Sequence, residues 1–275
     1  DLNLSGNIFT FYEGKEMGEI WGFRTAGIFA SNEEANNWAI DDYHKNGDNF
    51  REYAGDLKFV DLNGDGRIGV GSATLDDYGD LDRLGNITPR YQDGLNLDAN
   101  WNGFGISLFF QGIGHRDWYP GCESGLFWGK YNRWYSQALK SQNGDNYVHV
   151  DYSTPNWVVT NMDKNPYWTR RVGLAANRNL GPLTWENDHY LQNAAYLRLK
   201  NATISYTLPE KFTSKLNISK VRVYLTGENL FAWSPIYKHT SMFDPEGIES
   251  GDSDFGGGSS GSTGLYGVGD GFSYP

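Results

Sequence analysis

The sequence predicts an all-β fold of antiparallel strands that have one apolar and one polar face. Three observations predict it: apolar and polar residues alternate over residues 90–110, a second alternating hairpin covers 195–231, and the connections differ greatly in length. Alternation with period two is typical of strands with one face in an apolar medium. That medium is either the core of a soluble protein or the lipid around a transmembrane barrel.

The first predicted hairpin consists of strands at Arg90–Trp101 and Phe104–Gln111. The dipeptide Asn102-Gly103 separates them, and Asn-Gly is the strongest short-range signal for a two-residue hairpin turn. In the barrel interpretation, the apolar positions face lipid and the polar positions face the lumen. We expect Leu95, Leu97, Ile106 and Leu108 on the lipid side, and Asn96, Asn100 and Ser107 on the lumen side.

The second predicted hairpin consists of strands at Ala195–Leu208 and Lys220–Phe231, and these strands continue an antiparallel meander. The alternation changes phase at Lys200-Asn201, which predicts a β-bulge there. Apolar residues over Leu2–Ile8 suggest the end of one more strand.

The connections between these strands are unequal. The turn at Asn102-Gly103 is minimal and the connection over 209–219 is short, whereas 11–89, 112–192 and 234–275 are long and rich in Trp, Asn, Asp and Gly. A compact soluble domain rarely carries such long loops. Outer-membrane barrels combine short periplasmic turns with long extracellular loops, so we expect these three segments to be extracellular.

Composition excludes several classes of protein. The 275 residues carry 34 acidic and 23 basic side chains, and the net charge of −11 argues against a nucleic-acid partner. A single cysteine excludes a disulfide framework and a multi-cysteine metal site. No apolar run reaches the ~20 residues of a membrane-spanning helix. The sequence contains no catalytic motif, and we do not expect an enzyme.

One loop has the spacing of a calcium site. Asp61, Asn63 and Asp65 followed by Gly66 give the pattern D-x-N-x-D-G, and the carbonyl of Arg67 adds a backbone ligand. The usual glutamate at the twelfth position is replaced by Ser72, so a later acidic residue must close the site. The candidates are Asp76, Asp77, Asp80 and Asp82. The alternative is a polar turn that binds no ion.

The segment from 116 to 185 is rich in aromatic residues. Loop aromatics stack on sugar rings or form protein interfaces. We therefore consider Trp118, Tyr119, Trp128, Trp134 and Trp168 as contacts for a substrate or a partner. The alternative is that these rings pack the loop on itself or lie in an interfacial girdle.

Taken together, several motifs resemble the C-terminal part of SusC/RagA-type TonB-dependent outer-membrane transporters of Bacteroidetes. The most characteristic are GDLKFVDLNGDG at 55–66, GNITPRY at 85–91 and YLTGENLF at 224–231. Further matching segments are 13–18, 21–29, 108–112 and 196–201. The matches follow the family's order along nearly the whole chain.

The resemblance implies that residues 1–275 form about five of the last strands of a 22-stranded transmembrane antiparallel β-barrel. The plug domain, the signal peptide, the TonB-contacting N-terminal part and the last strand are expected outside this sequence. In this family a SusD-like surface lipoprotein covers the barrel. Asp80 matches an acidic position of the family and is our first choice of closing calcium ligand, with Asp76 second.

The sequence thus predicts TonB-dependent import of oligosaccharides or peptides across the bacterial outer membrane, with a SusD-like lipoprotein as partner and Ca²⁺ as a structural ion. The alternative is a secreted, calcium-stabilised β-sandwich that binds glycans through its Trp-rich loops.

Overall fold

The computed structural model describes residues 6–41, 52–120, 125–128, 140–170, 186–239 and 244–248. The chain divides into two compact units. Unit 1 consists of residues 1–88, 117–192 and 238–275, and unit 2 of residues 89–116 and 193–237. Among the described residues, none of the helices has the length and apolar character needed to cross a bilayer.

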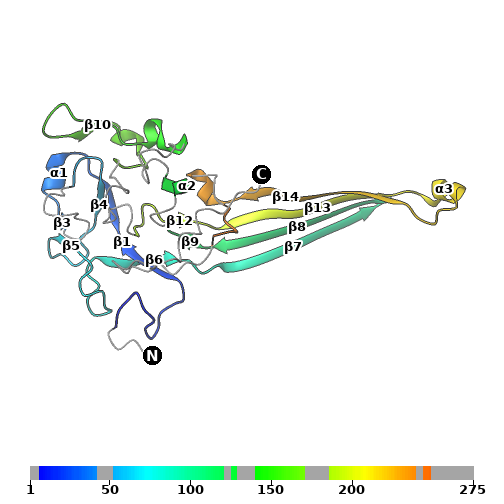
Figure 1. The fold of residues 1–275 in the computed structure, drawn as a ribbon, viewed down its shortest axis with the longest axis horizontal. Coiled ribbons are helices and arrows are strands. Elements are labelled where there is room, and N and C mark those ends of the chain that lie inside the picture. The colour runs from blue at the N-terminus through cyan, green and yellow to red at the C-terminus, as the bar shows by residue number, and fades with distance from the viewer. Residues whose placement is uncertain are drawn as a thin grey trace. The chain divides into compact units, whose positions relative to one another are not determined.

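Unit 2 is a four-stranded antiparallel sheet of long strands (Figure 1). Its strands are β7 (Arg90–Trp101), β8 (Phe104–His115), β13 (Tyr196–Thr207) and β14 (Arg222–Trp233). Their order across the sheet is β14-β13-β8-β7, so each strand pairs with the one that precedes or follows it among these four strands. The predicted strands and meander are confirmed, and β8 continues four residues beyond its predicted end at Gln111.

Local chemistry explains the two irregular points of this sheet. Asn102 and Gly103 have φ of 46° and 85°, and left-handed φ at both central residues defines the type I′ turn that suits a tight hairpin. The register of β13 shifts between Leu199 and Asn201 against both neighbouring strands, so the predicted bulge is confirmed. The connection from β13 to β14 contains α3 (Glu210–Thr213) and a 3-10 turn, η5 (Ser214–Leu216).

Unit 1 contains short strands joined by irregular segments. The antiparallel pairs are β1 (Glu19–Phe23) with β6 (Leu81–Asn86), β2 (Thr25–Ile28) with β4 (Leu57–Phe59), and β10 (Val150–Asp151) with β11 (Val158–Val159). Strands β3 (Ile40–Asp41) and β5 (Arg67–Ile68) are parallel. The remaining strands are β9 (Asp117–Trp118) and β12 (Gln192–Asn193), the latter at the boundary between the units.

The helical elements of this part are short. The α-helices among its described residues are α1 (Asn32–Asn36) and α2 (Gly125–Trp128). The 3-10 turns are η2 (Lys140–Gln142), η3 (Gly144–Asn146), η4 (Met162–Lys164) and, at the boundary between the units, η6 (Pro235–Lys238).

Unit 1 has an aromatic core of its own. Trp118, Trp128, Trp168 and Tyr190 are at most 1% exposed, and the Trp128 ring lies edge-on to Tyr190 with centroids 5.1 Å apart. A second contact joins Phe23 of β1 to Phe59 of β4 at 5.6 Å. The segments 11–89 and 112–192, interpreted from sequence as long loops, therefore contain strands and a packed interior. Most of the strand expected at Leu2–Ile8 lies outside the described residues, which begin at Gly6 and show a single bridge from Asn7 to Thr74.

Candidate functional site

The sheet of unit 2 separates apolar from polar side chains. Directly paired residues share a face, and the registers give apolar rows of four across the sheet. One row is Leu97, Leu108, Ala202 and Gly227; the next is Ala99, Ile106, Ile204 and Leu225. The four predicted apolar positions lie on this face, and the three predicted polar positions lie on the other. The predicted separation of faces is confirmed.

Aromatic side chains bound the apolar face at both ends. Trp101, Phe104 and Tyr206 form the row beside the 102–103 turn, and the rings of Phe104 and Tyr206 are 4.4 Å apart. At the other end Phe110 and Phe231 lie in the row of Leu95. These two rows are six residues apart, or about 20 Å along the strand. Outer-membrane barrels have an apolar band about 25 Å tall between two aromatic girdles.

The apolar face is open to its surroundings in this chain. Leu95, Leu97 and Ile106 are 53%, 46% and 41% exposed, and Leu225 is 75% exposed. A soluble monomer rarely exposes a continuous apolar surface of this extent. A sheet packed as half of a sandwich would bury these side chains, so the alternative fold is not supported.

Polar side chains on the opposite face bond to one another. Thr203 and Thr226 are paired across β13 and β14, and their hydroxyl oxygens are 2.9 Å apart. Arg222 donates from Nη2 to the Ser205 hydroxyl at 2.8 Å. This face is therefore suited to water.

The predicted calcium loop forms a series of tight Asx turns. Asp61 accepts hydrogen bonds from the backbone N–H of Gly64 at 2.6 Å and of Gly66 at 2.8 Å. Asn63 Oδ1 accepts from the N–H of Asp65 at 2.9 Å. The side-chain oxygens therefore curl over the loop backbone, and Gly64 and Gly66 permit this with φ of 77° and 81°.

Asp80 holds the two ends of this loop together. It is 1% exposed, and its carboxylate accepts from the backbone N–H of Leu62 at 2.7 Å, of Asn63 at 3.3 Å and of Gly69 at 2.7 Å. The sequence identified Asp80 as relevant to the loop, but not this use of its oxygens as acceptors for backbone amides. Asp76, the second choice, is exposed.

The residues described include no group of three or more His, Cys, Asp or Glu side chains placed to hold a metal ion. A calcium site of the predicted kind would therefore depend on the amide oxygen of Asn63 and the carbonyl oxygen of Arg67 as well as on carboxylates. An all-oxygen donor set of this kind fits a hard cation such as Ca²⁺.

The aromatic residues proposed as contacts are mostly buried. Trp118, Tyr119, Trp128 and Trp168 are 1%, 8%, 0% and 1% exposed. Their rings pack the interior of unit 1, so the prediction that they contact a substrate or partner is wrong for these four. For the described residues of this segment, the structure shows the alternative, in which the rings pack on one another. Trp134 lies outside the described residues.

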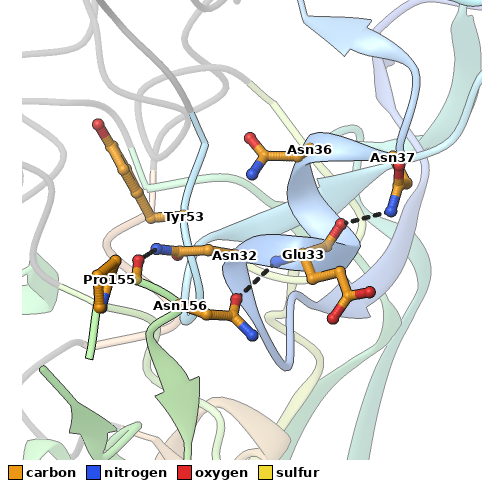
Figure 2. Close-up of a pocket in the computed structure, with 7 residues that line it drawn as sticks. All are labelled: Asn32, Glu33, Asn36, Asn37, Tyr53, Pro155 and Asn156. Carbon is orange, nitrogen blue, oxygen red and sulfur yellow. Dashed lines mark hydrogen bonds between the residues drawn. The ribbon is translucent and has the colours of Figure 1, made fainter. Parts of the chain in front are cut away.

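Sequence reasoning missed a polar pocket of about 570 Å³ in unit 1, which we call the amide pocket. Figure 2 shows the seven residues that line it: Asn32, Glu33, Asn36, Asn37, Tyr53, Pro155 and Asn156. They come from α1, the segment before β4 and the segment between β10 and β11. The four asparagines carry no spacing that identifies them, because residues 37 and 156 meet only in the folded chain.

Helix α1 is positioned by its first residues. Ser31 caps it by accepting from the N–H of Glu34 at 3.1 Å, and the Glu34 carboxylate accepts from the N–H of Ala30 at 2.8 Å. This resembles the S-x-x-E capping box. Lys58 on β4 bonds to Glu34 at 2.6 Å, which ties the helix to the strand pair beside it.

An ion pair between the partly exposed Arg170 and the buried Asp56 adjoins Tyr53 of the pocket. Arg170 donates from Nε and Nη2 to the two oxygens of Asp56 at 2.9 and 2.6 Å, and its guanidinium lies 5.1 Å from the centre of the Tyr53 ring. Burial raises the pKa of Asp56, whereas the two bonds from Arg170 and the N–H of Tyr53 oppose that rise. Burial, followed by the neighbouring charge of Asp41, raises the pKa of Glu52 well above its usual range.

Similarity to known proteins agrees with the sequence motifs. No family model matches the chain. It is 24% identical over 224 residues to TonB-dependent receptor P3 of Formosa agariphila, covering 81% of this chain and 18% of the relative. TonB-dependent receptor P26 of the same organism is 24% identical over 240 residues, covering 86% and 20%. The resemblance to TonB-dependent transporters is confirmed.

The chain spans about a fifth of the length of these curated relatives. Solved structures give partial likenesses. The RagAB peptide importer in its open-open state has a TM-score of 0.42 at 17% identity over 82% of this chain and 20% of that chain. The RagAB peptide transporter gives 0.40 at 18% over 78% and 19%. The strands of this chain are defined by its own backbone hydrogen bonds.

Proposed function

We propose that this chain forms part of the wall of an outer-membrane β-barrel that imports nutrients with energy delivered by TonB. The observation that carries the proposal is the sheet of unit 2, with a continuous exposed apolar face bounded by aromatic rows and a polar opposite face. Lipid would cover the first face, and the second would line the aqueous lumen. The relatives' name, TonB-dependent receptor, supports the energy source.

The edges of the sheet support a larger barrel. Strands β7 and β14 are the outer strands of the four, so each has one side without a strand partner in this sheet. Unpaired backbone groups in hydrocarbon cost several kcal/mol each, and barrels avoid that cost by closing. We propose that further strands of the same transporter pair with both edges, and that the complete transporter also contains a plug and a TonB-contacting part.

The sequence resemblance supports a SusD-like lipoprotein as the partner and oligosaccharides or peptides as the cargo. It also supports a transport role rather than an enzymatic one. Under this proposal, the segments 11–89 and 112–192 are extracellular, because they adjoin the ends of β7 and β8 opposite to the short turn at Asn102-Gly103, which would lie on the periplasmic side.

We also propose that Ca²⁺ binds the 61–69 loop through Asp61, Asn63, Asp65 and the carbonyl of Arg67, with Asp80 closing the site. The side-chain oxygens of Asp61, Asn63 and Asp65 all bond to backbone amides of this one loop, which supports the proposal. The ion would stabilise the loop and take no part in transport.

The calcium proposal is tested by terbium luminescence and by metal analysis of the full-length protein after dialysis against EDTA. Asp65→Ala should abolish the Tb³⁺ signal that Ca²⁺ displaces, whereas Asp163→Ala, at an exposed position in η4, should leave it unchanged. Equal signals from both variants and the unaltered protein would contradict the site.

The transport proposal is tested on the full-length protein in its native membrane. A folded barrel should migrate faster in a detergent gel before heating than after, and uptake of its oligosaccharide or peptide cargo should stop when TonB is deleted. A protein that fractionates as a soluble species without detergent would favour the glycan-binding sandwich instead.

A further inference from the structure

The amide pocket presents hydrogen-bonding groups that the fold itself leaves unused. Asn36 is exposed and its amide bonds to none of the described residues. Asn156 uses its Oδ1 as an acceptor for the N–H of Glu33 at 2.9 Å, and its Nδ2 donates to none of the described residues. Asn37 donates from Nδ2 to the carbonyl oxygen of Glu33 at 2.9 Å (Figure 2). Its Oδ1 accepts no hydrogen bond from the described residues. The pocket therefore offers both donors and acceptors at neutral groups.

The pocket is held in shape by a buried asparagine. Asn32 donates from Nδ2 to the carbonyl of Pro155 at 3.1 Å, and its Oδ1 accepts from the N–H of Ala54 at 3.0 Å. Its own N–H donates to the carbonyl of Trp157 at 3.0 Å. Asn32 thus joins the three segments that form the pocket wall. The free-energy cost of ordering these segments when a ligand binds should therefore be small.

An aromatic surface adjoins these amides. Tyr53 lines the pocket, and its ring packs against Trp157 at 4.8 Å with an interplanar angle of 30°. Tyr152 stands edge-on to Trp157 at 4.9 Å and is 56% exposed. The Arg170 guanidinium, bonded to Asp56, lies 5.1 Å from the centre of the Tyr53 ring. Rigid aromatic rings beside hydrogen-bonding groups suit ligands with both apolar and polar faces.

The charges near the pocket disfavour an ionic ligand. Among the described residues, Arg170 near the pocket is already held by two hydrogen bonds from its guanidinium to Asp56, so its charge is not available to an anion. Glu33 is exposed at the rim and would repel an anion. One carboxylate among four amides is also a poor match for a multivalent cation, which prefers several charged oxygens.

We propose that the amide pocket binds a neutral, hydroxyl-rich ligand, namely one sugar residue of an oligosaccharide. A hydroxyl group both donates and accepts, as does a carboxamide, so adjacent hydroxyls pair with Asn36, Asn37 and Asn156. The C–H face of the sugar ring would lie toward Tyr53. The site deepens the proposed import function by selecting oligosaccharide over peptide, but its binding is measurable without transport.

The test uses the full-length protein, purified in a detergent without a sugar headgroup. It is applied to an array of neutral α- and β-linked oligomers of glucose, galactose, mannose, xylose and arabinose. The best binder is then titrated by calorimetry. Asn36→Ala should weaken binding about five- to tenfold, since it removes one or two hydrogen bonds without touching the fold. The control Asn146→Ala, an exposed asparagine outside the pocket, should leave affinity within twofold.

Three results would overturn the proposal. One is the absence of binding across the array, and another is glycan binding that Asn36→Ala and Asn146→Ala affect equally. The third is tighter binding of a neutral alanine-serine pentapeptide than of any glycan, with that binding lost in Asn36→Ala. Each of these leaves the membrane assignment intact, because gel migration is measured without a ligand and the loss of uptake on TonB deletion does not depend on which cargo is carried.

Discussion

Removing the carboxylate of Asp80 should open the 61–69 loop locally without unfolding unit 1. This side chain is 1% exposed and accepts two short hydrogen bonds from backbone amides, both at 2.7 Å, and a longer one at 3.3 Å. Hydrogen bonds to a charged acceptor contribute about 1.5–3 kcal/mol each. Leu62 is 45% exposed, so water partly replaces the lost acceptor at that end. We therefore take the lower end of the range for the two short bonds, or about 3 kcal/mol for Asp80→Ala.

That free energy corresponds to roughly a 150-fold increase in the population of the open loop, since 1.36 kcal/mol is tenfold. Hydrogen exchange followed by mass spectrometry measures it directly, because local opening exposes the amides of Leu62, Asn63 and Gly69. The measurement is made in EDTA so that any bound cation does not contribute. Asp80→Asn keeps one acceptor oxygen and should give an intermediate effect, about tenfold.

Asp76→Ala is the matched control, because Asp76 is a nearby exposed carboxylate that bonds to none of the described residues. Its peptide should exchange at the unaltered rate. If Asp80→Ala changes the exchange rate by less than threefold, or by no more than Asp76→Ala does, the hydrogen bonds to Asp80 contribute little to loop stability and the prediction is wrong.

Three further predictions concern other parts of the chain. Leu97→Arg should cost about 2–4 kcal/mol in a bilayer and reduce the heat-modifiable fraction of the full-length protein, whereas Asn96→Arg, one position away on the polar face, should be tolerated. Equal losses would contradict the assignment of faces. Gly103→Ala should destabilise the hairpin by about 1–3 kcal/mol, because φ is 85° there and a Cβ would lie 2.8 Å from the carbonyl oxygen of Thr207. A chemical-denaturation midpoint equal to that of the unaltered protein would refute this prediction. Burial raises the pKa of Glu186 to about 8. The neutral form of Glu186 therefore stabilises the fold below about pH 4, and that stability is lost as pH rises through about 8. Glu186→Gln should flatten the fall in Tm between pH 5 and 8.5, and an unchanged fall would refute the assignment.

The sequence by itself determined the sheet of unit 2. Alternation is a property of neighbouring residues on a pleated strand, so residues 90–101 reveal their faces without reference to the rest of the chain. The Asn102-Gly103 turn and the bulge near Asn201 are equally local, because each follows from the conformations that a few adjacent residues adopt.

Only the tertiary structure decided what the long connecting segments do. The burial of Trp118 and Trp168 depends on partners far along the chain, and composition alone was equally consistent with exposed contact residues. Asn32 meets Pro155 across 123 positions, so no spacing in the sequence reveals the amide pocket that they build. Strand periodicity is set by the local backbone, whereas a core and a pocket are set by which distant segments meet.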